Sequence, residues 1–384
     1  MKHKKNISSN LISIHKAHMQ NAFKNANKGT NKVYPNPFVG AVIVKAGKIM
    51  GEGYHEECGK AHAEVNAIRM AQTHAKGADL YVTLEPCSTY GRTPPCTTAI
   101  AEAGIKRVFF GAYDSNKKNR KKAEMALKTK NIETVFIDFQ KTNDELNRVF
   151  LHNLTSKIPY VILKAAISLD GKIMDSKGKS KWITGAQSRT AAHQIRQLSD
   201  GIIIGANTFN KDNPKLTVRL AGNQKFKDPA KIIISASGNL KTNNELLSKN
   251  TKGEVIIFTS EPVSAKLRKN IKNNNCIVVS MGKALKQISL KGCLTYLKKR
   301  GYHNLLVEGG AKLLGQFIKL KLFNELHLYV APKFFGGNKG SFCGDKTLFT
   351  VNNKTFLKLD KIKQINNDLY LEYRNVYRNN KSLK

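Results

Sequence analysis

Acidic side chains are scarce in this sequence. Its 384 residues include 27 aspartates and glutamates against 65 lysines and arginines, which gives a formal net charge of +38. The lysines are spread along the whole length, a number of them beside asparagine, and they form no compact arginine-rich stripe. We therefore interpret the charge as a solvated basic surface that attracts phosphorylated metabolites, with no nucleic-acid partner. A functional contact with a polyanion such as RNA is the alternative that this charge leaves open.

Long apolar runs and a cysteine framework are also missing. No apolar run approaches the roughly 18 residues of a membrane span, although a hydrophobic fraction of 41% suffices for ordinary cores. Residues 1–10 are polar and basic with no apolar segment after them, so a signal peptide is not expected. The six cysteines are sparse, which favours a reducing compartment over disulfides. We expect a cytoplasmic protein of two or three domains without membrane contact.

Two short segments have the composition of a zinc-dependent hydrolytic site. The first is His62-Ala-Glu64, and the second holds Cys87 after a proline and then Cys96. One imidazole and two thiolates leave the fourth position of a tetrahedral Zn²⁺ for water, whose pKa falls to about 7 on the metal. In zinc deaminases the glutamate of H-x-E moves a proton between this water and the departing ammonia. The sequence therefore predicts one Zn²⁺ per chain on His62, Cys87 and Cys96, with Glu64 as the catalytic acid and base.

The spacing of the two cysteines departs from the common P-C-x-x-C form. Eight residues, 88–95, separate Cys87 from Cys96, and this long loop narrows the choice of family. Pro94-Pro95 is expected to begin a helix. That would place Cys96 at a helix N-terminus, where partial positive charge helps to hold a thiolate. A purely structural zinc site is the alternative for these residues.

The chain divides near residues 155–159. Before the break, strand and helix signals alternate and predict a layered α/β domain. The expected helices are 11–28 and 61–75, and the expected strands are 39–44, 49–54, 79–84 and 106–112. After the break, short apolar runs separated by helical segments predict a mostly parallel sheet with both faces covered. These runs are 160–167, 201–205, 231–235, 254–259, 276–280, 303–307 and 325–330, with edge strands expected in 368–377.

Several motifs in order give a more specific reading. In the first part they are Tyr-Pro-Asn-Pro-Phe-Val-Gly (34–40), Gly-Tyr-His (53–55), His-Ala-Glu (62–64) and Leu-Glu-Pro-Cys to Pro-Pro-Cys (84–96). In the second part they are 166–171, 181–184, 212–219, Val-Glu-Gly-Gly (307–310) and Ala-Pro-Lys (331–333). The chain, over roughly residues 10–375, resembles the bifunctional riboflavin-biosynthesis enzymes, in which a pyrimidine deaminase is fused to a reductase.

The resemblance implies two domains with two activities. Residues 1–155 would be a zinc-dependent pyrimidine deaminase with a cytidine-deaminase-like three-layer fold, and residues 156–384 an NADPH-dependent reductase with a dihydrofolate-reductase-like fold. The first would hydrolyse the exocyclic amine of 2,5-diamino-6-(5-phosphoribosylamino)pyrimidin-4(3H)-one. The second would reduce the ribosyl side chain to ribityl. The resemblance also implies a homo-oligomer.

For the deaminase the resemblance implies substrate contacts at Asn36, His55, Asp114 and Asn116. An amide offers a donor and an acceptor together, which suits the edge of a pyrimidine. The alternatives are a rigid turn around Asn36, a strand-end cap at His55, and simple turn formation by Asp114 and Asn116.

For the reductase the resemblance implies a cofactor set and a substrate set. The glycines at 309 and 310 would let backbone N–H groups approach a pyrophosphate at a helix N-terminus, although a simple turn is the alternative. Arg196 and Arg219 suit a phosphate or ordinary ion pairs, Trp182 could instead pack in the core, and Lys164 is left unassigned. The cofactor set is Ala166, Trp182, Thr208, Asp212, Gly310, Ala311, Lys312, Leu313, Leu314, Gly315 and Gln316. The substrate set is Ser180, Arg196, Leu216, Arg219 and Glu308.

The chain departs from the family pattern at three places. Thr89 stands where the family usually has a histidine, residues 117–122 replace a loop with glycine and proline, and Ser235-Ala236 replaces Asp-Ser or Asp-Thr. The last departure motivates one rival hypothesis, a deaminase with a decayed reductase, and leaves the preference for NADPH over NADH open. The net charge motivates another, an RNA-directed deaminase. A non-catalytic scaffold stabilised by zinc is the third.

Overall fold

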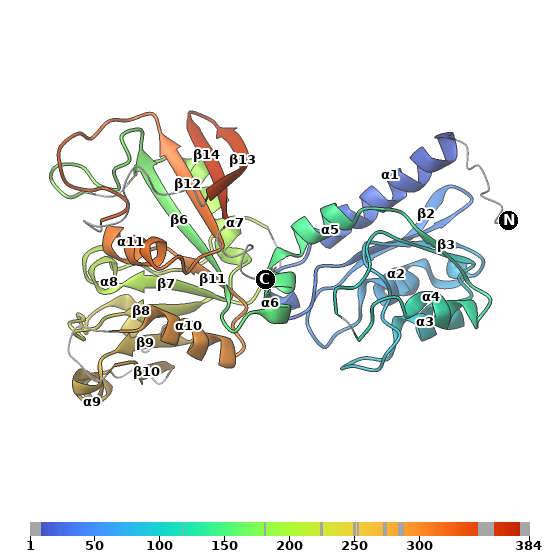
Figure 1. Ribbon diagram of the computed structural model, residues 1–384, viewed down its shortest axis with the longest axis horizontal. Helices are drawn as coiled ribbons and strands as arrows, with labels where there is room; N and C mark the ends of the chain where they lie inside the picture. The colour runs from blue at the N-terminus through green and yellow to red at the C-terminus, as the bar shows by residue number, and fades with distance from the viewer. Residues whose placement is uncertain are drawn as a thin grey trace. The chain divides into compact units, whose positions relative to one another are not determined.

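The chain forms two compact units in a computed structural model, residues Met1–Thr155 (unit 1) and Ser156–Lys384 (unit 2) (Figure 1). The structure describes residues 9–116, 118–179, 182–222, 226–248, 251, 253–271, 275–282, 288–344 and 357–376. Within these ranges no helix has the length and apolar character that crossing a membrane requires. Each unit is described separately below.

Unit 1 is built on a five-stranded sheet of order β2-β1-β3-β4-β5. Strand β1 is antiparallel to both of its neighbours, whereas β3, β4 and β5 run parallel. The strands are β1 (Gly40–Lys45), β2 (Lys48–Tyr54), β3 (Asp79–Val82), β4 (Arg107–Phe110) and β5 (Glu133–Phe136). The helices are α1 (Ser9–Ala26), α2 (Ala63–Ala71), α3 (Cys96–Glu102), α4 (Ala123–Lys128), α5 (Gln140–Leu146) and α6 (Arg148–Thr155), with 3₁₀ turns at Asn31–Val33 and Gln72–Ala75.

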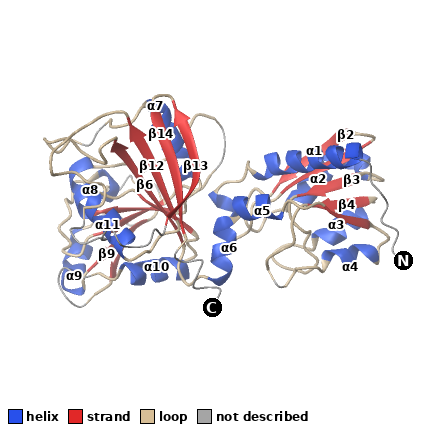
Figure 2. Ribbon diagram, turned by 45° about the horizontal axis from the view of Figure 1, so that its top comes forward, coloured by secondary structure: helices blue, strands red, loops and turns tan. Residues whose placement is uncertain are grey.

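Both faces of this sheet are covered, because its strands are apolar on both sides. Helix α1 packs Met19, Ala22 and Phe23 against one face. Helices α2 and α3 pack small residues and Ile100 against the other, so that the unit has three layers (Figure 2). Close packing of α2 is possible because Gly51 and Gly53 of β2 lie under its backbone, where a Cβ atom would come within 2.3 Å of the helix. The predicted three-layer α/β fold is confirmed.

Unit 2 is built on a nine-stranded sheet of order β10-β9-β8-β7-β11-β6-β12-β14-β13. The strands from β10 to β12 are mutually parallel, and the last two are antiparallel. They are β6 (Tyr160–Ser168), β7 (Gly201–Gly205), β8 (Ala230–Ile234), β9 (Val255–Thr259), β10 (Cys276–Ser280), β11 (Asn304–Val307), β12 (Glu325–Ala331), β13 (Leu357–Ile365) and β14 (Asp368–Asn375).

The central strands of unit 2 are short β-branched runs such as Ile202-Ile203-Ile204, and both of their faces are buried. One core contains residues of α10 and α11, and a second contains residues of α8 and α9. The helices are α7 (Ala186–Gln197), α8 (Ala206–Asp212), α9 (Glu261–Asn270), α10 (Leu290–Lys299) and α11 (Ala311–Lys319), with a 3₁₀ turn at Glu245–Leu247. The predicted parallel sheet is therefore confirmed strand by strand, and β13 is an additional edge strand.

Candidate active sites

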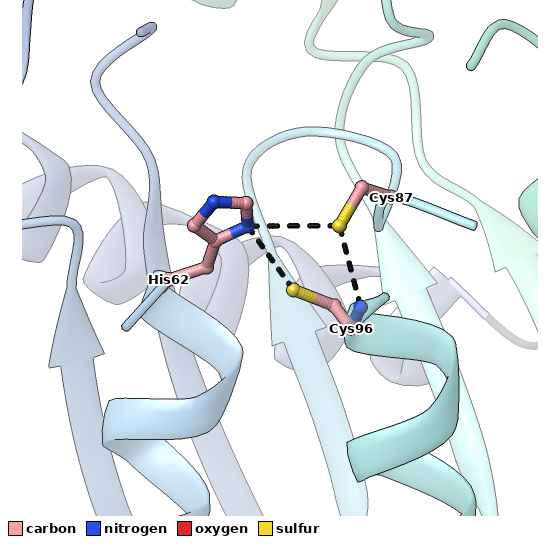
Figure 3. A group of neighbouring side chains, drawn as sticks. All are labelled: His62, Cys87 and Cys96. Carbon is pink, nitrogen blue, oxygen red and sulfur yellow. Dashed lines mark hydrogen bonds between the residues drawn. The ribbon is translucent and has the colours of Figure 1, made fainter. Parts of the chain in front are cut away.

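Three side chains from unit 1 converge on one point (Figure 3). His62 is the residue before α2, Cys96 is the first residue of α3, and Cys87 lies in the loop after β3. His62 Nδ1 lies 3.2 Å from Cys96 Sγ and 3.6 Å from Cys87 Sγ. Ligands at ordinary Zn–N and Zn–S distances on a tetrahedral ion would be about 3.5 Å apart. The nitrogen and the two sulfurs therefore fit zinc in donor type and in spacing.

The surroundings of the three ligands favour metal binding. The backbone N–H of Cys96, at the start of α3, donates to Cys87 Sγ at 3.3 Å, and Thr93 Oγ1 lies 3.4 Å from His62 Nε2, the ring nitrogen that faces away from the sulfurs. Hydrogen bonds from Cys96, and then from His62, lower the pKa of the Cys87 thiol. The same pairing with Cys87 raises the pKa of Cys96. Metal ions bind cysteine as the thiolate. A thiol with a lowered pKa, as at Cys87, loses its proton more easily when a cation binds.

Glu64 lies in the first turn of α2, beside the three ligands. Its side chain is 3% exposed, and burial raises the pKa of its carboxyl group. A carboxyl group with a raised pKa can hold a proton near neutral pH and release it again, which a general acid and base must do.

A cavity of about 410 Å³ opens beside these candidate metal ligands and has His62 and Cys87 in its lining. Asn36 and His55 lie in its lining, next to each other, and Asn36 Nδ2 is 3.0 Å from His55 Nε2. His55 Nδ1 lies 3.2 Å from the carbonyl oxygen of Ala61 and so carries the proton. Desolvation lowers the pKa of His55 to about 4. Both ring nitrogens are used inside the protein, so His55 orients Asn36, whose amide oxygen has no hydrogen bond among the described contacts.

Asp114 and Asn116 also line this cavity, in the loop after β4. The Asp114 carboxylate accepts from the Asn116 N–H at 2.8 Å and from Asn119 Nδ2 at 3.0 Å. Burial raises the pKa of Asp114. The structure thus brings Asn36, His55, Asp114 and Asn116 to one cavity with the candidate zinc ligands. The bond from the Asn116 N–H to Asp114 is also the one expected if these two residues simply form a turn.

Glu308 occupies the centre of a second cluster, in unit 2. Arg196 Nε and Nη2 donate to the two oxygens of its buried carboxylate at 2.7 and 2.6 Å, and Lys164 Nζ lies 3.6 Å away. After the opposing cost of burial, Lys164 and Arg196 lower the pKa of Glu308 to about 2. Arg196 Nη1 donates to the carbonyl oxygen of Thr217. In this structure Arg196 therefore forms an ion pair with Glu308, as the alternative to phosphate binding predicts.

The residues expected at the cofactor lie at the carboxyl edge of the parallel strands. The Gly310 N–H donates to Thr208 Oγ1 at 3.1 Å, which joins the segment after β11 to α8. Helix α11 begins directly after Gly310 with no side-chain cap. A Cβ atom on Gly309 would lie 2.9 Å from Leu313. Apart from the bond of the Gly310 N–H to Thr208, helix α11 thus begins without a side-chain cap, which fits a phosphate group of a dinucleotide.

The remaining residues of the two reductase sets differ in their exposure. Trp182 is 66% exposed, so the alternative that it packs in the core is wrong. The guanidinium carbon of Arg189 lies over its ring, 4.2 Å from the ring centre. The side chains of Leu216 and Leu314 are 3% and 1% exposed and pack in the cores. Trp182 and Leu216 have left-handed backbones, with φ of 64° and 49°, which often marks ligand sites.

The other members of these sets are placed as follows. Ala166 is half-buried on β6, Asp212 ends α8, and Lys312, Leu313, Gly315 and Gln316 lie in α11 with Ala311 at its start. Arg219 donates through Nη1 to Thr217 Oγ1 and through its backbone N–H to His193 Nδ1. Ser180 lies outside the described residues.

Sequence reasoning missed three residues that shape these sites. Glu85 accepts backbone hydrogen bonds from Asp114, Lys121 and Ala123, so it anchors the loop after β4. Asn119 joins that loop to Thr89. Lys164, which the sequence left unassigned, lies near Glu308. The feature of the sequence that could have indicated a role is that Lys164 is the one charged residue in the otherwise apolar segment of β6.

Comparison with known proteins gives the same two-part organisation. Residues 12–112 match the family model of the cytidine and deoxycytidylate deaminase zinc-binding region, and residues 159–371 match that of the RibD C-terminal domain. The Aquifex aeolicus riboflavin biosynthesis protein RibD is 37% identical to the chain, over 95% of this chain and 99% of its own length. The Bacillus amyloliquefaciens protein of the same name is 38% identical, over 92% and 94%.

Solved structures of two-domain enzymes match the chain over almost its whole length. A deaminase/reductase from Thermotoga maritima, described as a diaminohydroxyphosphoribosylaminopyrimidine deaminase and 5-amino-6-(5-phosphoribosylamino)uracil reductase, superposes with a TM-score of 0.81 at 33% identity. The match covers 95% of this chain and 99% of that one. RibD from Acinetobacter baumannii gives 0.81 at 32% identity, with the same coverage.

Fold, sites and relatives define a bifunctional enzyme, a zinc-binding deaminase joined to an NADPH-using reductase. The chain belongs to the RibD family of riboflavin biosynthesis proteins. Its substrate is a phosphoribosylated pyrimidine. The expected activities and cofactors are therefore confirmed, and neither the decayed reductase nor the RNA-directed deaminase is favoured.

Proposed function

We propose that residues 1–155 deaminate the diaminopyrimidinone ribotide and that residues 156–384 reduce the ribosyl group of the product. The observation that supports this division best is the convergence of His62, Cys87 and Cys96 beside a buried Glu64 within unit 1. We further propose that the protein acts in the cytoplasm as a homo-oligomer.

In the deaminase, zinc on His62, Cys87 and Cys96 would supply a water activated for attack. Glu64 would accept a proton from that water and deliver it to the departing amino group. Asn36, oriented by His55, would hold the pyrimidine edge through its amide, and the loop with Asp114 and Asn116 would contact the ribosyl group. Burial of Glu64 keeps its proton within the site.

In the reductase, NADPH would supply the hydride. The uncapped N-terminus of α11 would hold its phosphates, and Thr208 would fix the backbone of Gly310 just before it through its hydrogen bond. Trp182 would cover the cofactor from its exposed position. Glu308 would hold Lys164 and Arg196 in place at the substrate. Arg219, whose side chain is exposed, would bind the substrate phosphate.

A coupled assay on the full chain tests the division. The wild type should release one ammonia and consume one NADPH for each diaminopyrimidinone ribotide. Gly310→Asp would place a negative charge where the cofactor phosphates are proposed to lie, and it should stop NADPH consumption while ammonia release continues. Loss of both activities in a folded, zinc-loaded Gly310→Asp protein would contradict the assignment of separate sites.

A further inference from the structure

Two loops of the deaminase are tied together by a single side chain, Asn119. Thr89 lies in the loop after β3, and Asn119 lies in the loop after β4, the neighbouring parallel strand. Thr89 Oγ1 is 2.7 Å from Asn119 Oδ1, and Asn119 Nδ2 is 3.0 Å from Asp114 Oδ2. All three residues line the cavity beside the zinc ligands.

The orientation of the Asn119 amide follows from its two neighbours. The Asp114 carboxylate can only accept, so the NH₂ group of Asn119 must face it. The amide oxygen then faces Thr89, and the single proton of the Thr89 hydroxyl is used on that oxygen. What Thr89 has left to offer the cavity is a pair of acceptor sites.

The loop that holds Asn119 is fixed at both ends. Glu85 accepts from the backbone of Lys121 and Ala123 at one end and of Asp114 at the other. Within the loop, the Asn119 N–H and the Arg120 N–H both donate to the Asn116 carbonyl oxygen. These bonds hold the backbone of Asn119 itself, which reduces the entropy cost of its two side-chain hydrogen bonds.

We propose that Asn119 is a positioning residue that turns Thr89 and Asp114 into an acceptor-only rim for the hydroxyl groups of the ribosyl part of the substrate. This inference rests on the proposed deaminase function of unit 1. Sugar hydroxyls can donate to such a rim, whereas a phosphate monoester, which is mostly a dianion above its second pKa of about 6, has only acceptor oxygens and negative charge to offer and is disfavoured there. The rim thus contributes to substrate affinity, and the reacting amine lies elsewhere, at Glu64 and the metal ligands.

The test compares isosteric threonine variants in the full-length, zinc-loaded protein. Thr89→Val removes only the hydroxyl and should raise KM for ammonia release about tenfold with kcat nearly unchanged, as expected for one lost hydrogen bond. Thr89→Ser should rescue the wild-type KM. Thr129→Val, at an exposed hydroxyl bonded to the Ala126 carbonyl oxygen, is the matched control and should leave both constants unchanged.

A double-mutant cycle tests the role of Asn119 itself. Asn119→Ala should raise KM by a similar factor, and adding Thr89→Val should raise it no further, because the two residues act as one unit. If Asn119→Ala does not fold, the comparison of Thr89→Val with Thr89→Ser still tests the inference. Independent multiplication of the two effects, a wild-type KM in Thr89→Val, or a loss confined to kcat would overturn the inference.

Competitive inhibition separates the sugar from the phosphate. The inhibition constant of ribose 5-phosphate should rise in Thr89→Val by the same factor as KM, while that of inorganic phosphate should stay constant. An equal rise for both would overturn the ribosyl assignment. A wild-type protein that releases no ammonia from the ribotide would instead refute the proposed function and this inference together.

Discussion

His55 holds Asn36 through a hydrogen bond that requires a neutral imidazole. Asn36 Nδ2 donates to His55 Nε2 at 3.0 Å, and the ring proton on Nδ1 faces the Ala61 carbonyl oxygen. Protonation would put a second donor on Nε2, opposite the amide NH₂, and would break the contact. We therefore expect His55 to act on the substrate through Asn36.

The first prediction concerns the pH dependence of substrate affinity. Desolvation holds the pKa of His55 at about 4, below the value of a free imidazole, so the neutral form persists until the pH falls toward 4. We expect KM for ammonia release to stay constant between about pH 6 and 8 and to rise only in more acidic solution. Steady-state kinetics with zinc content measured at each pH checks this. A step in KM near pH 6.5 that His55→Gln removes would contradict the neutral imidazole assigned to His55.

The second prediction separates the zinc thiols from the other cysteines. Cys87→Ser should lose the bound zinc and ammonia release, because an alcohol is a far poorer zinc ligand than a thiolate. Cys58→Ser is the matched control, since Cys58 Sγ contacts Arg92 Nη1 and no metal ligand in the described contacts. Metal analysis after dialysis against a chelator gives the readout. Zinc retained by Cys87→Ser would exclude Cys87 as a ligand.

The third prediction concerns the stability of unit 2. Glu308→Gln removes the charge that pairs with Arg196 and Lys164 in a buried site, and it should lower the free energy of unfolding by about 3 kcal/mol. Glu245→Gln, in an exposed pair with Lys215, should change it by less than about 1 kcal/mol. Urea unfolding of each variant and of the wild type, followed by circular dichroism, gives the readout. Equal effects of the two substitutions would show that the Glu308 cluster does not stabilise the unit.

Much of the fold could be predicted because the strands of unit 2 are buried on both faces. Runs such as Ile202-Ile203-Ile204 and residues 255–259 are short, β-branched and bounded by turn residues, so their positions are visible in the sequence. Strand β13 was missed because its burial is low along most of its length and lysines alternate with leucine and isoleucine. An edge strand of this kind depends on its pairing with β14 and has no apolar signal of its own.

The convergence of His62, Cys87 and Cys96 could be predicted because their residue types and spacing are distinctive. The contacts of Glu85, Asn119 and Arg196 could not, because each joins segments far apart in the chain. Glu85 and Asn119 meet their partners only after parallel strands bring two loops to one edge, and Arg196 reaches Glu308 across 112 residues. A charge or amide in a loop has many possible partners, and folding selects one.

Glu64→Gln gives the most direct test of the account, since it keeps the size of the side chain and removes the proton carrier. In the full chain with zinc bound, ammonia release from the diaminopyrimidinone ribotide should fall by at least about a hundredfold, and NADPH consumption from that substrate should stop with it. NADPH consumption on the already deaminated ribotide should continue at the wild-type rate. Unchanged ammonia release by the zinc-loaded Glu64→Gln protein would contradict the proposed site.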